Sequence, residues 1–173
     1  MTFPSPPRGI KAIPWRIPIY LYRTGFGWAL GNRFLLLRHI GRISGEDRYA
    51  VLELIHSTPE EGVYYVVSGF GTRSDWFQNI LKQPQVKIQV GAKKMSAVAR
   101  RLDPSDGAGI LLAYAQEHPG SLKTLSSLLG YQIDFTREGI LDFGRQIPVV
   151  QFTTQSTTPT EKNQTQKELS KES

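Results

Sequence analysis

The feature that most constrains the fold is a series of short β-forming runs separated by glycine and proline. The clearest run, Val86 to Val90 (VKIQV), alternates apolar and polar residues, turns at Gly91-Ala92 and returns from Met95 to Leu102. Such alternation is typical of a strand with one buried and one solvated face, and a short link containing glycine favours a hairpin. The sequence therefore predicts an antiparallel hairpin in this region.

Further runs predict the rest of the sheet. Val63 to Ser68 (VYYVVS) is the strongest of them, because β-branched and aromatic side chains suit a pleated, half-buried surface. Turn-forming residues bound the other runs as well. The additional predicted strands cover residues 34–40, 48–56, 63–68 and 147–152.

Helical signals lie between these strands. Ser74-Asp75 provides an N-cap and Pro84 stops the helix that follows, while Pro104 suits the first turn of another helix. The predicted helices cover residues 17–30, 74–83, 105–118 and 122–129. Because the strands are grouped as hairpins with helices inserted between them, the predicted fold is mainly β, an antiparallel barrel with peripheral helices.

The chain of 173 residues suits one domain with short extensions. We expect a basic, aromatic N-terminal arm at 1–16, a barrel domain at 17–154 and a polar tail at 155–173. The tail contains one aliphatic residue, Leu169, so it buries too little apolar surface to offset its ordering entropy and is predicted to be disordered.

Composition narrows the location and the partners. The absence of cysteine suits a reducing compartment, and no apolar run approaches the roughly 20 residues of a spanning helix, so we expect a cytoplasmic protein. The net charge is +6, and seven basic residues precede the first acidic residue, Glu46. A basic segment of this kind attracts anionic lipid, nucleic acid or a polyanionic cofactor, and charge alone does not choose among them.

The first candidate site is the link from Gly41 to Arg48 (GRISGEDR), between two predicted strands. It carries two guanidinium groups, the Ser44 hydroxyl and backbone amides made flexible by glycine. Arginine forks and turn amides both suit phosphate. The alternative is a solvated hairpin loop whose arginines pair with Glu46 and Asp47.

The second candidate site runs from Ser68 to Trp76 (SGFGTRSDW), where a strand leads through two glycines into a helix. A helix N-terminus favours an anion or an electron-rich ring edge, and Gly69 and Gly71 would let a flat ring approach the backbone. The alternative is a flexible connection with a helix cap. The segment matches neither a phosphate-binding P-loop nor a dinucleotide-binding fingerprint.

Taken together, GR-x-[ST]-G-x-x-R, SGFG, R-S-D-W-F-x-N-I and Q-P-x-V-x-I-x-V-G resemble the deazaflavin-dependent nitroreductase family, from about Leu21 to Phe152. The resemblance implies a split β-barrel like those that bind flavin mononucleotide (FMN). It also implies an oxidoreductase that uses coenzyme F-420, an 8-hydroxy-5-deazaflavin, and passes hydride to a quinone, an enone or a nitroaromatic compound.

The resemblance also implies roles for individual residues. The first loop would hold the phosphate and acidic tail of the cofactor, two backbone positions would lie beside the ring, and Ser68 would polarise the acceptor. The chain departs from the family pattern at Ile43 and Gly69, where relatives carry lysine, and Arg73 would compensate. No tyrosine cluster occurs between His118 and Leu129, so nitroreduction does not follow. The implied cofactor-binding residues are Arg42, Ser44, Gly45, Arg48, Val51, Leu52, Ser68, Gly69, Phe70, Gly71, Arg73, Trp76 and Asn79.

Several alternatives remain open from the sequence. FMN is the alternative cofactor, and a non-catalytic flavin- or deazaflavin-binding protein is the alternative function. The partners expected are a small-molecule hydride acceptor, a second copy in a homodimer and a membrane surface at the N-terminus, with no nucleic acid. No metal site is expected, because His39, His56 and His118 lie on separate predicted elements, and His39 suits a core or barrel-mouth position.

Overall fold

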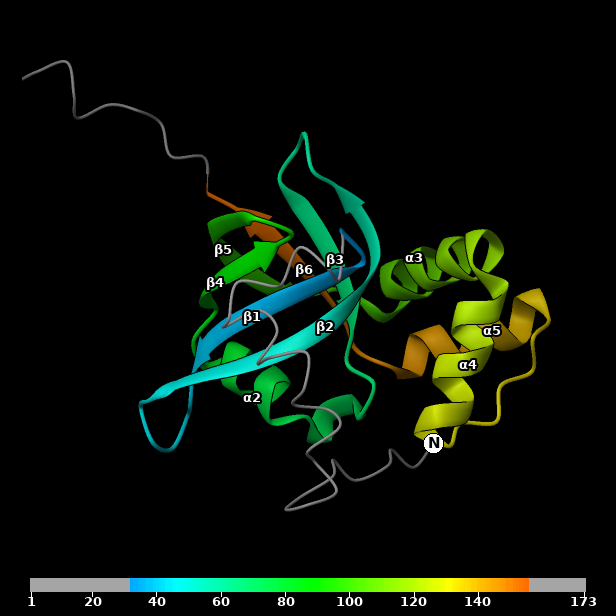
Figure 1. Cartoon of the computed structure of the whole chain (residues 1–173). Coiled ribbons are helices and arrows are strands. Elements are labelled where there is room, and N and C mark those ends of the chain that lie inside the picture. The colour runs from blue at the N-terminus through cyan, green and yellow to red at the C-terminus, as the bar shows by residue number, and fades with distance from the viewer. Residues whose placement is uncertain (1–31, 156–173) are drawn as a thin grey trace, which may run out of the picture.

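The computed structural model describes residues 32–155. Six antiparallel strands form a closed barrel in the order β1-β2-β3-β6-β5-β4 (Figure 1). This confirms the predicted antiparallel barrel. The strands are β1 (Phe34–Ile40), β2 (Asp47–Thr58), β3 (Val63–Val67), β4 (Gln85–Val90), β5 (Lys93–Arg101) and β6 (Val149–Thr154).

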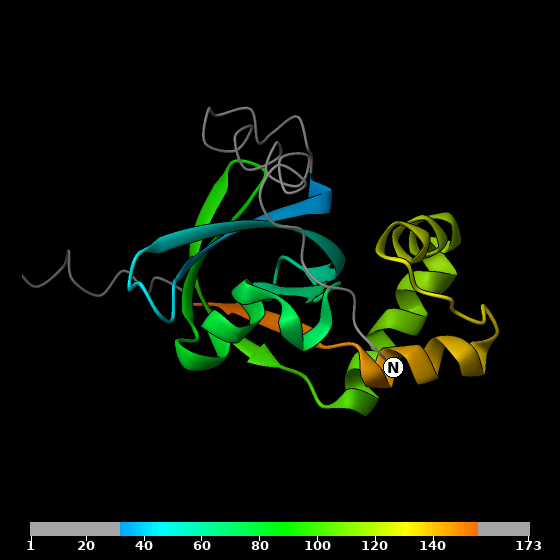
Figure 2. The same ribbon diagram turned by 90° about the horizontal axis from the view of Figure 1, so that it is seen from below.

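The helices lie in two places. A short 3-10 helix, η3 (Gly71–Arg73), and α2 (Asp75–Lys82) follow β3 and lie across one end of the barrel, next to β1 and β2 (Figure 1). The other three helices form a group beside the barrel (Figure 2). They are α3 (Pro104–Glu117), α4 (Pro119–Leu129) and α5 (Arg137–Gln146).

Alternation along the strands builds the barrel core. On β4, Val86, Ile88 and Val90 point inward, while Lys87 lies on the exposed face. Phe77 and Ile80 of α2 join this core and close one end of the barrel. Burial of these apolar side chains, worth roughly 25 cal/mol per Å², is the main stabilising contribution.

The helical group has a second core against the outer surface of the barrel. It includes Ile55 of β2 and Val149 of β6, packed with apolar residues of all three helices. Helices α3 and α5 approach closely at Gly144. A Cβ atom added to Gly144 would lie only 2.6 Å from the Cα atom of Ala108. A glycine is therefore required at this crossing.

All six predicted strands match observed strands to within two residues at each end. Helix α5 was missed, because its two glycines weaken the helical pattern. The signal that does mark it is the N-cap Thr136, whose side chain accepts from the Gly139 amide at 3.1 Å. The predicted arm at 1–16 and helix at 17–30 lie outside the described residues, as does the tail beyond Gln155.

One half of β2 is paired on a single side. β2 pairs with β1 from Asp47 to Glu53, but it pairs with β3 only from Leu54 onward. Within residues 32–155, no strand adjoins the other edge of residues 47–53. In an antiparallel ladder, successive residues direct their N–H and C=O groups to opposite sides. Of the neighbours Val51 and Leu52, one therefore directs its backbone polar groups to this free edge.

Candidate functional site

The loop between β1 and β2 is a compact turn with outward-facing donors. The Gly45 amide donates to the Gly41 carbonyl at 2.8 Å, and the Gly41 amide donates to the Glu46 carbonyl at 2.8 Å. Gly45 has a φ of 70°, which favours glycine at this position. Among residues 32–155, the amides of Ile43 and Ser44 contact no protein acceptor. These two N–H groups resemble the free donors at the first turn of a helix.

Arg42 ties this loop to α2. Its amide donates to Asn79 Oδ1 at 3.0 Å, and its Nη1 atom lies 3.0 Å from both Asn79 Oδ1 and Asp75 Oδ1. Lys82 Nζ donates to the Arg42 carbonyl at 3.0 Å. Backbone and side chain of Arg42 are thus both held, and its first role is to position the loop.

Asn79 is buried and links Arg42 to His39. Because Asn79 Oδ1 accepts from Arg42, its Nδ2 group is the donor to His39 Nδ1, at 3.1 Å. His39 is therefore neutral, with its proton on Nε2. Burial, followed by the charge of Arg48, lowers the pKa of His39 to about 4. His39 is buried and hydrogen-bonded, as the sequence predicts for a core or barrel-mouth position.

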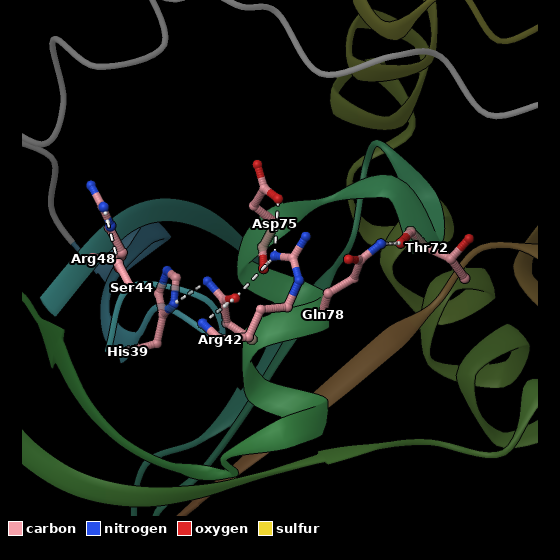
Figure 3. A network of polar contacts seen from close by, with 8 residues as sticks. His39, Arg42, Ser44, Arg48, Thr72, Asp75 and Gln78 are labelled. Atoms are coloured by element: carbon pink, nitrogen blue, oxygen red, sulfur yellow. Dashed lines mark hydrogen bonds and ion pairs between the residues drawn. The ribbon is translucent and has the colours of Figure 1, made fainter. Parts of the chain in front are cut away.

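Arg48 and Ser44 face solvent on the other side of the loop (Figure 3). Arg48 Nη2 donates to Ser44 Oγ at 3.3 Å and to Glu46 Oε2 at 2.9 Å. The side chains of Arg48 and Glu46 are 54% and 70% exposed, so their ion pair is weak and exchanges readily with an incoming anion. The loop thus offers two amides, a hydroxyl and a guanidinium group to one anionic ligand.

The turn after β3 is built around a buried hydroxyl. Ser68 is fully buried, and its Oγ lies 2.7 Å from both the Gly71 carbonyl and Ser74 Oγ. A hydroxyl has one hydrogen, so Ser68 donates to the carbonyl and accepts from Ser74. In this arrangement the Ser68 hydroxyl shapes the turn. Its predicted part in polarising the acceptor would require these bonds to open, and it stays a prediction.

The two glycines of this turn have structural reasons of their own. Gly71 has a φ of 59°, and a Cβ atom on Gly69 would lie 2.8 Å from Leu129 Cδ1. The Gly69 carbonyl also accepts from the Tyr131 hydroxyl at 2.8 Å. The helical group therefore packs directly on the turn, and Phe70 packs against the same apolar cluster.

The remaining predicted site residues lie between these two segments. Trp76 is half-buried against the barrel core and packs edge-on to Phe77, so packing accounts for much of its surface. Arg73 is exposed at the end of η3. Leu52 points into the barrel and Val51 lies on its outer face, so the free edge of β2 presents the backbone of one of them and neither side chain.

The structure brings the first loop and α2 together through a set of contacts that sequence reasoning missed. Asp75, Asn79 and Lys82 each contact Arg42, at spacings of four and three residues. This spacing places them on one face of α2 and was available in the sequence. Tyr131 was missed as well, because nothing local to it indicates a contact with Gly69.

A family model described as F420H(2)-dependent quinone reductase matches residues 21–121. The chain belongs to this family. The reductase is accordingly an F-420-dependent oxidoreductase, and F-420 rather than FMN is the cofactor that the family uses. No protein of curated function matches the chain.

Solved structures resemble the reductase at low identity. One described as an F420-H2 dependent reductase, FDR-A, is 20% identical and covers 70% of this chain and 95% of its own, with a TM-score of 0.49. A structure described as a domain-swapped dimer is 19% identical, covers 78% and 98%, and also has a TM-score of 0.49. A Clostridium acetobutylicum protein related to general stress protein 26, of the pyridoxinephosphate oxidase family, is 8% identical, covers 78% and 84%, and has a TM-score of 0.50. At 8% identity, the last of these structures shares only its fold with the reductase.

The donors of the first loop fit the anionic part of F-420. The free amides of Ile43 and Ser44, the Ser44 hydroxyl and Arg48 are all donors, and the exposed Glu46 is the acid that an anion would displace from Arg48. The free edge of β2 offers backbone donors and acceptors to a polar ring. The chain therefore contains the groups that such a cofactor requires.

Proposed function

We propose that the reductase binds F-420 between the loop 41–48, the free edge of β2 and the turn 68–74, and reduces a quinone or another activated small molecule there. One observation carries the proposal: the loop is fixed to α2 through Arg42 and Asn79 while its other donors face outward. Such a preformed donor set costs little reorganisation when an anion binds.

Each part of the site has its own role in this proposal. Ile43, Ser44 and Arg48 hold the phosphate, and Arg42 keeps their spacing through its bonds to α2. The backbone of Val51 and Leu52 orients the ring along β2. The buried bond between Ser68 and Gly71 fixes the shape of the turn that forms the second wall. When bound and reduced, the cofactor supplies the hydride, so the chain contributes alignment and exclusion of water.

Binding of oxidised F-420 to wild type and to Arg48→Ala, followed by fluorescence quenching, tests the proposal. We expect Kd to rise about 10- to 150-fold in the variant, because a charge-assisted hydrogen bond is worth about 1.5–3 kcal/mol. Arg145→Ala is the matched control: Arg145 is 51% exposed and pairs with Asp142, much as Arg48 pairs with Glu46. Equal affinity of wild type and Arg48→Ala would contradict the proposed site.

Turnover tests the reaction itself. Reduced F-420 mixed with a soluble quinone should be oxidised faster with wild-type protein than with Arg48→Ala at subsaturating cofactor. At saturating cofactor the two rates should converge, because Arg48 is assigned to binding. A rate no greater than that without protein, tested across quinones and enones, would contradict the assigned acceptor class.

The remaining partners stay predictions. A homodimer is tested by light scattering during gel filtration, and contact of the N-terminal arm with membranes is tested by flotation with anionic vesicles. The arm lies outside the described residues. No helix between residues 32 and 155 is long and apolar enough to cross a bilayer. A cytoplasmic location is the expectation from the sequence.

A further inference from the structure

The two walls of the proposed ring site diverge at a fork, the point where the pairing of β2 with β3 ends at Leu54 opposite Val66. On one side of the fork, residues 47–53 of β2 form the first wall. On the other side, β3 leads into the turn 68–74, which forms the second wall. Strand pairing joins the walls at the fork, and the bonds of Arg42 with α2 join them again beside the loop. The width of the gap between these points depends on what else holds each wall.

Tyr114 of α3 holds the first wall. Its buried hydroxyl donates to Glu53 Oε1 at 2.7 Å. Arg33 donates to the same oxygen from Nε at 3.0 Å and from Nη2 at 2.8 Å, and its Nη2 also donates to Ser121 Oγ of α4 at 3.1 Å. Glu53 is the last residue of β2 before the fork, and its side chain is only 16% exposed. Glu53 thus ties this end of the first wall to two helices.

Tyr131, in the link between α4 and α5, holds the second wall. Its hydroxyl donates to the Gly69 carbonyl at 2.8 Å, and its ring packs edge-on to Phe143 of α5 with the ring centroids 5.1 Å apart. Burial is the main cause that raises the pKa of Tyr114 and of Tyr131 to about 12. Both hydroxyl groups therefore keep their hydrogen at neutral pH and act as donors.

The two hydroxyl bonds come from one packed unit. Tyr114 and Tyr131 both belong to the apolar cluster that joins the three helices and packs them on Ile55 of β2. A unit that is bonded to both walls fixes the distance between them. Apolar packing alone would set this distance less closely, because hydrophobic contacts are non-directional and both tyrosines line a cavity of about 10 Å³. A hydrogen bond restricts both the distance and the angle between its partners.

We propose that Tyr114 and Tyr131 are positioning residues that set the width of the gap in which the deazaflavin ring meets its acceptor. This inference rests on the proposed function, because that function places the ring between the two walls. The phosphate is assigned to the loop 41–48, which neither tyrosine contacts through its hydroxyl. Loss of either hydroxyl should therefore leave the phosphate anchor intact, misalign the ring and the acceptor, and slow hydride transfer.

The test compares wild type with Tyr114→Phe and Tyr131→Phe, which each lose one oxygen atom and keep the aromatic ring. Fluorescence titration should give a Kd for oxidised F-420 within about 2-fold of wild type. Single-turnover oxidation of bound, reduced F-420 by a saturating soluble quinone should be about 10-fold slower in Tyr131→Phe, because a misplacement of about 1 Å can cost about 100-fold. Tyr114→Phe should slow it less, because Glu53 keeps its bonds from Arg33.

A second readout separates positioning from stability. Quenching of the bound, oxidised ring by acrylamide reports how open the gap is, and the quenching constant should rise in both variants. Rates are expressed per bound cofactor, so a smaller folded fraction alone would change neither quantity. Tyr65→Phe is the matched control: its hydroxyl accepts from Gln151 Nε2 at 3.4 Å, and its ring packs on the same apolar cluster. It should leave the Kd, the rate and the quenching constant unchanged.

The outcomes distinguish this inference from the proposed function. Unchanged rate and unchanged acrylamide quenching in both variants would overturn the positioning role. Weaker F-420 binding with an unchanged rate per bound cofactor would also overturn it, because the tyrosines would then belong to the anchor. Failure of the wild-type protein to bind F-420, or to oxidise it with any quinone or enone, would instead overturn the proposed function.

Discussion

The loop from Gly41 to Arg48 and the turn from Ser68 to Ser74 are both short, polar and rich in glycine and serine, yet they use their polar atoms differently. The loop leaves the amides of Ile43 and Ser44 facing solvent and fixes only one side of itself to α2. The turn uses its hydroxyls internally, between Ser68, Ser74 and the Gly71 carbonyl. Similar composition thus produces a ligand-binding surface in one place and a rigid wall in the other.

Among the substitutions that test this comparison, Ser68→Val is expected to have the largest effect on stability. The variant removes both bonds of the buried hydroxyl and leaves the Gly71 carbonyl with only the longer bond from the Ser74 amide, at 3.4 Å, so the free energy of unfolding should fall by about 3 kcal/mol. Urea denaturation measures the change. Ser96→Val on the exposed face of β5 is the matched control and should change stability by less than about 0.5 kcal/mol. A fall in F-420 affinity without loss of stability would show that Ser68 acts on the ligand instead.

Asn79→Ala tests the other side of the comparison. It removes the acceptor for the Arg42 amide and guanidinium and the donor to His39, so stability should fall by about 2 kcal/mol and F-420 affinity should fall as well. Gln78→Ala, on the same helix, removes one bond to the Thr72 carbonyl and is the control. If Asn79→Ala lowers stability but leaves F-420 affinity unchanged, the contacts of Asn79 with Arg42 and His39 do not set the binding shape of the loop.

Acid should weaken the contact between Asn79 and His39. His39 has a pKa of about 4 in the folded protein against 6.5 in the unfolded chain, so between these values the unfolded state binds more protons. Stability therefore rises with pH over this window, and it should fall by about 2 kcal/mol from pH 7 to pH 5 because of this group. His39→Asn should reduce the slope measured by urea denaturation. An unchanged slope would place the titrating group elsewhere in the protein.

Ser44→Ala should have the smallest effect. Ser44 accepts from Arg48 and from the Glu46 amide on an exposed loop, so its removal should leave the melting temperature almost unchanged. F-420 affinity should fall about 2- to 5-fold, because one neutral hydrogen bond to the ligand is lost. Thermal melting and fluorescence titration together check both statements. A large loss of stability would mean that Ser44 belongs to the scaffold.

The barrel was predictable because its signals are local. Alternation in β4 and β-branched runs in β3 mark strands directly, and the glycines at 45 and 91 mark turns with positive φ. Helix α5 was not predictable in the same way. Its Gly144 weakens a helix taken alone and is explained only by the approach of Ala108 from α3.

The candidate site was predictable as two segments but not as an arrangement. The motifs located Arg42 and Arg48 together, whereas only the fold shows that Arg42 is held by α2 and that Arg48 faces solvent. The pair Arg38 and Lys87 lay outside every motif, because the two residues become neighbours only through strand pairing. Local sequence patterns do not reveal contacts between segments that are far apart in the chain.

The bond between Arg42 and Asn79 also bears on the order of folding. It joins residues 37 positions apart, and the contact from Asn79 to His39 spans 40. The β1–β2 hairpin emerges before α2 during synthesis, but its loop cannot take its binding shape until α2 has formed. Contacts of long sequence separation form late because loop closure costs entropy. The ability to bind the cofactor should therefore appear as a late event in refolding, after the first hairpin has already formed.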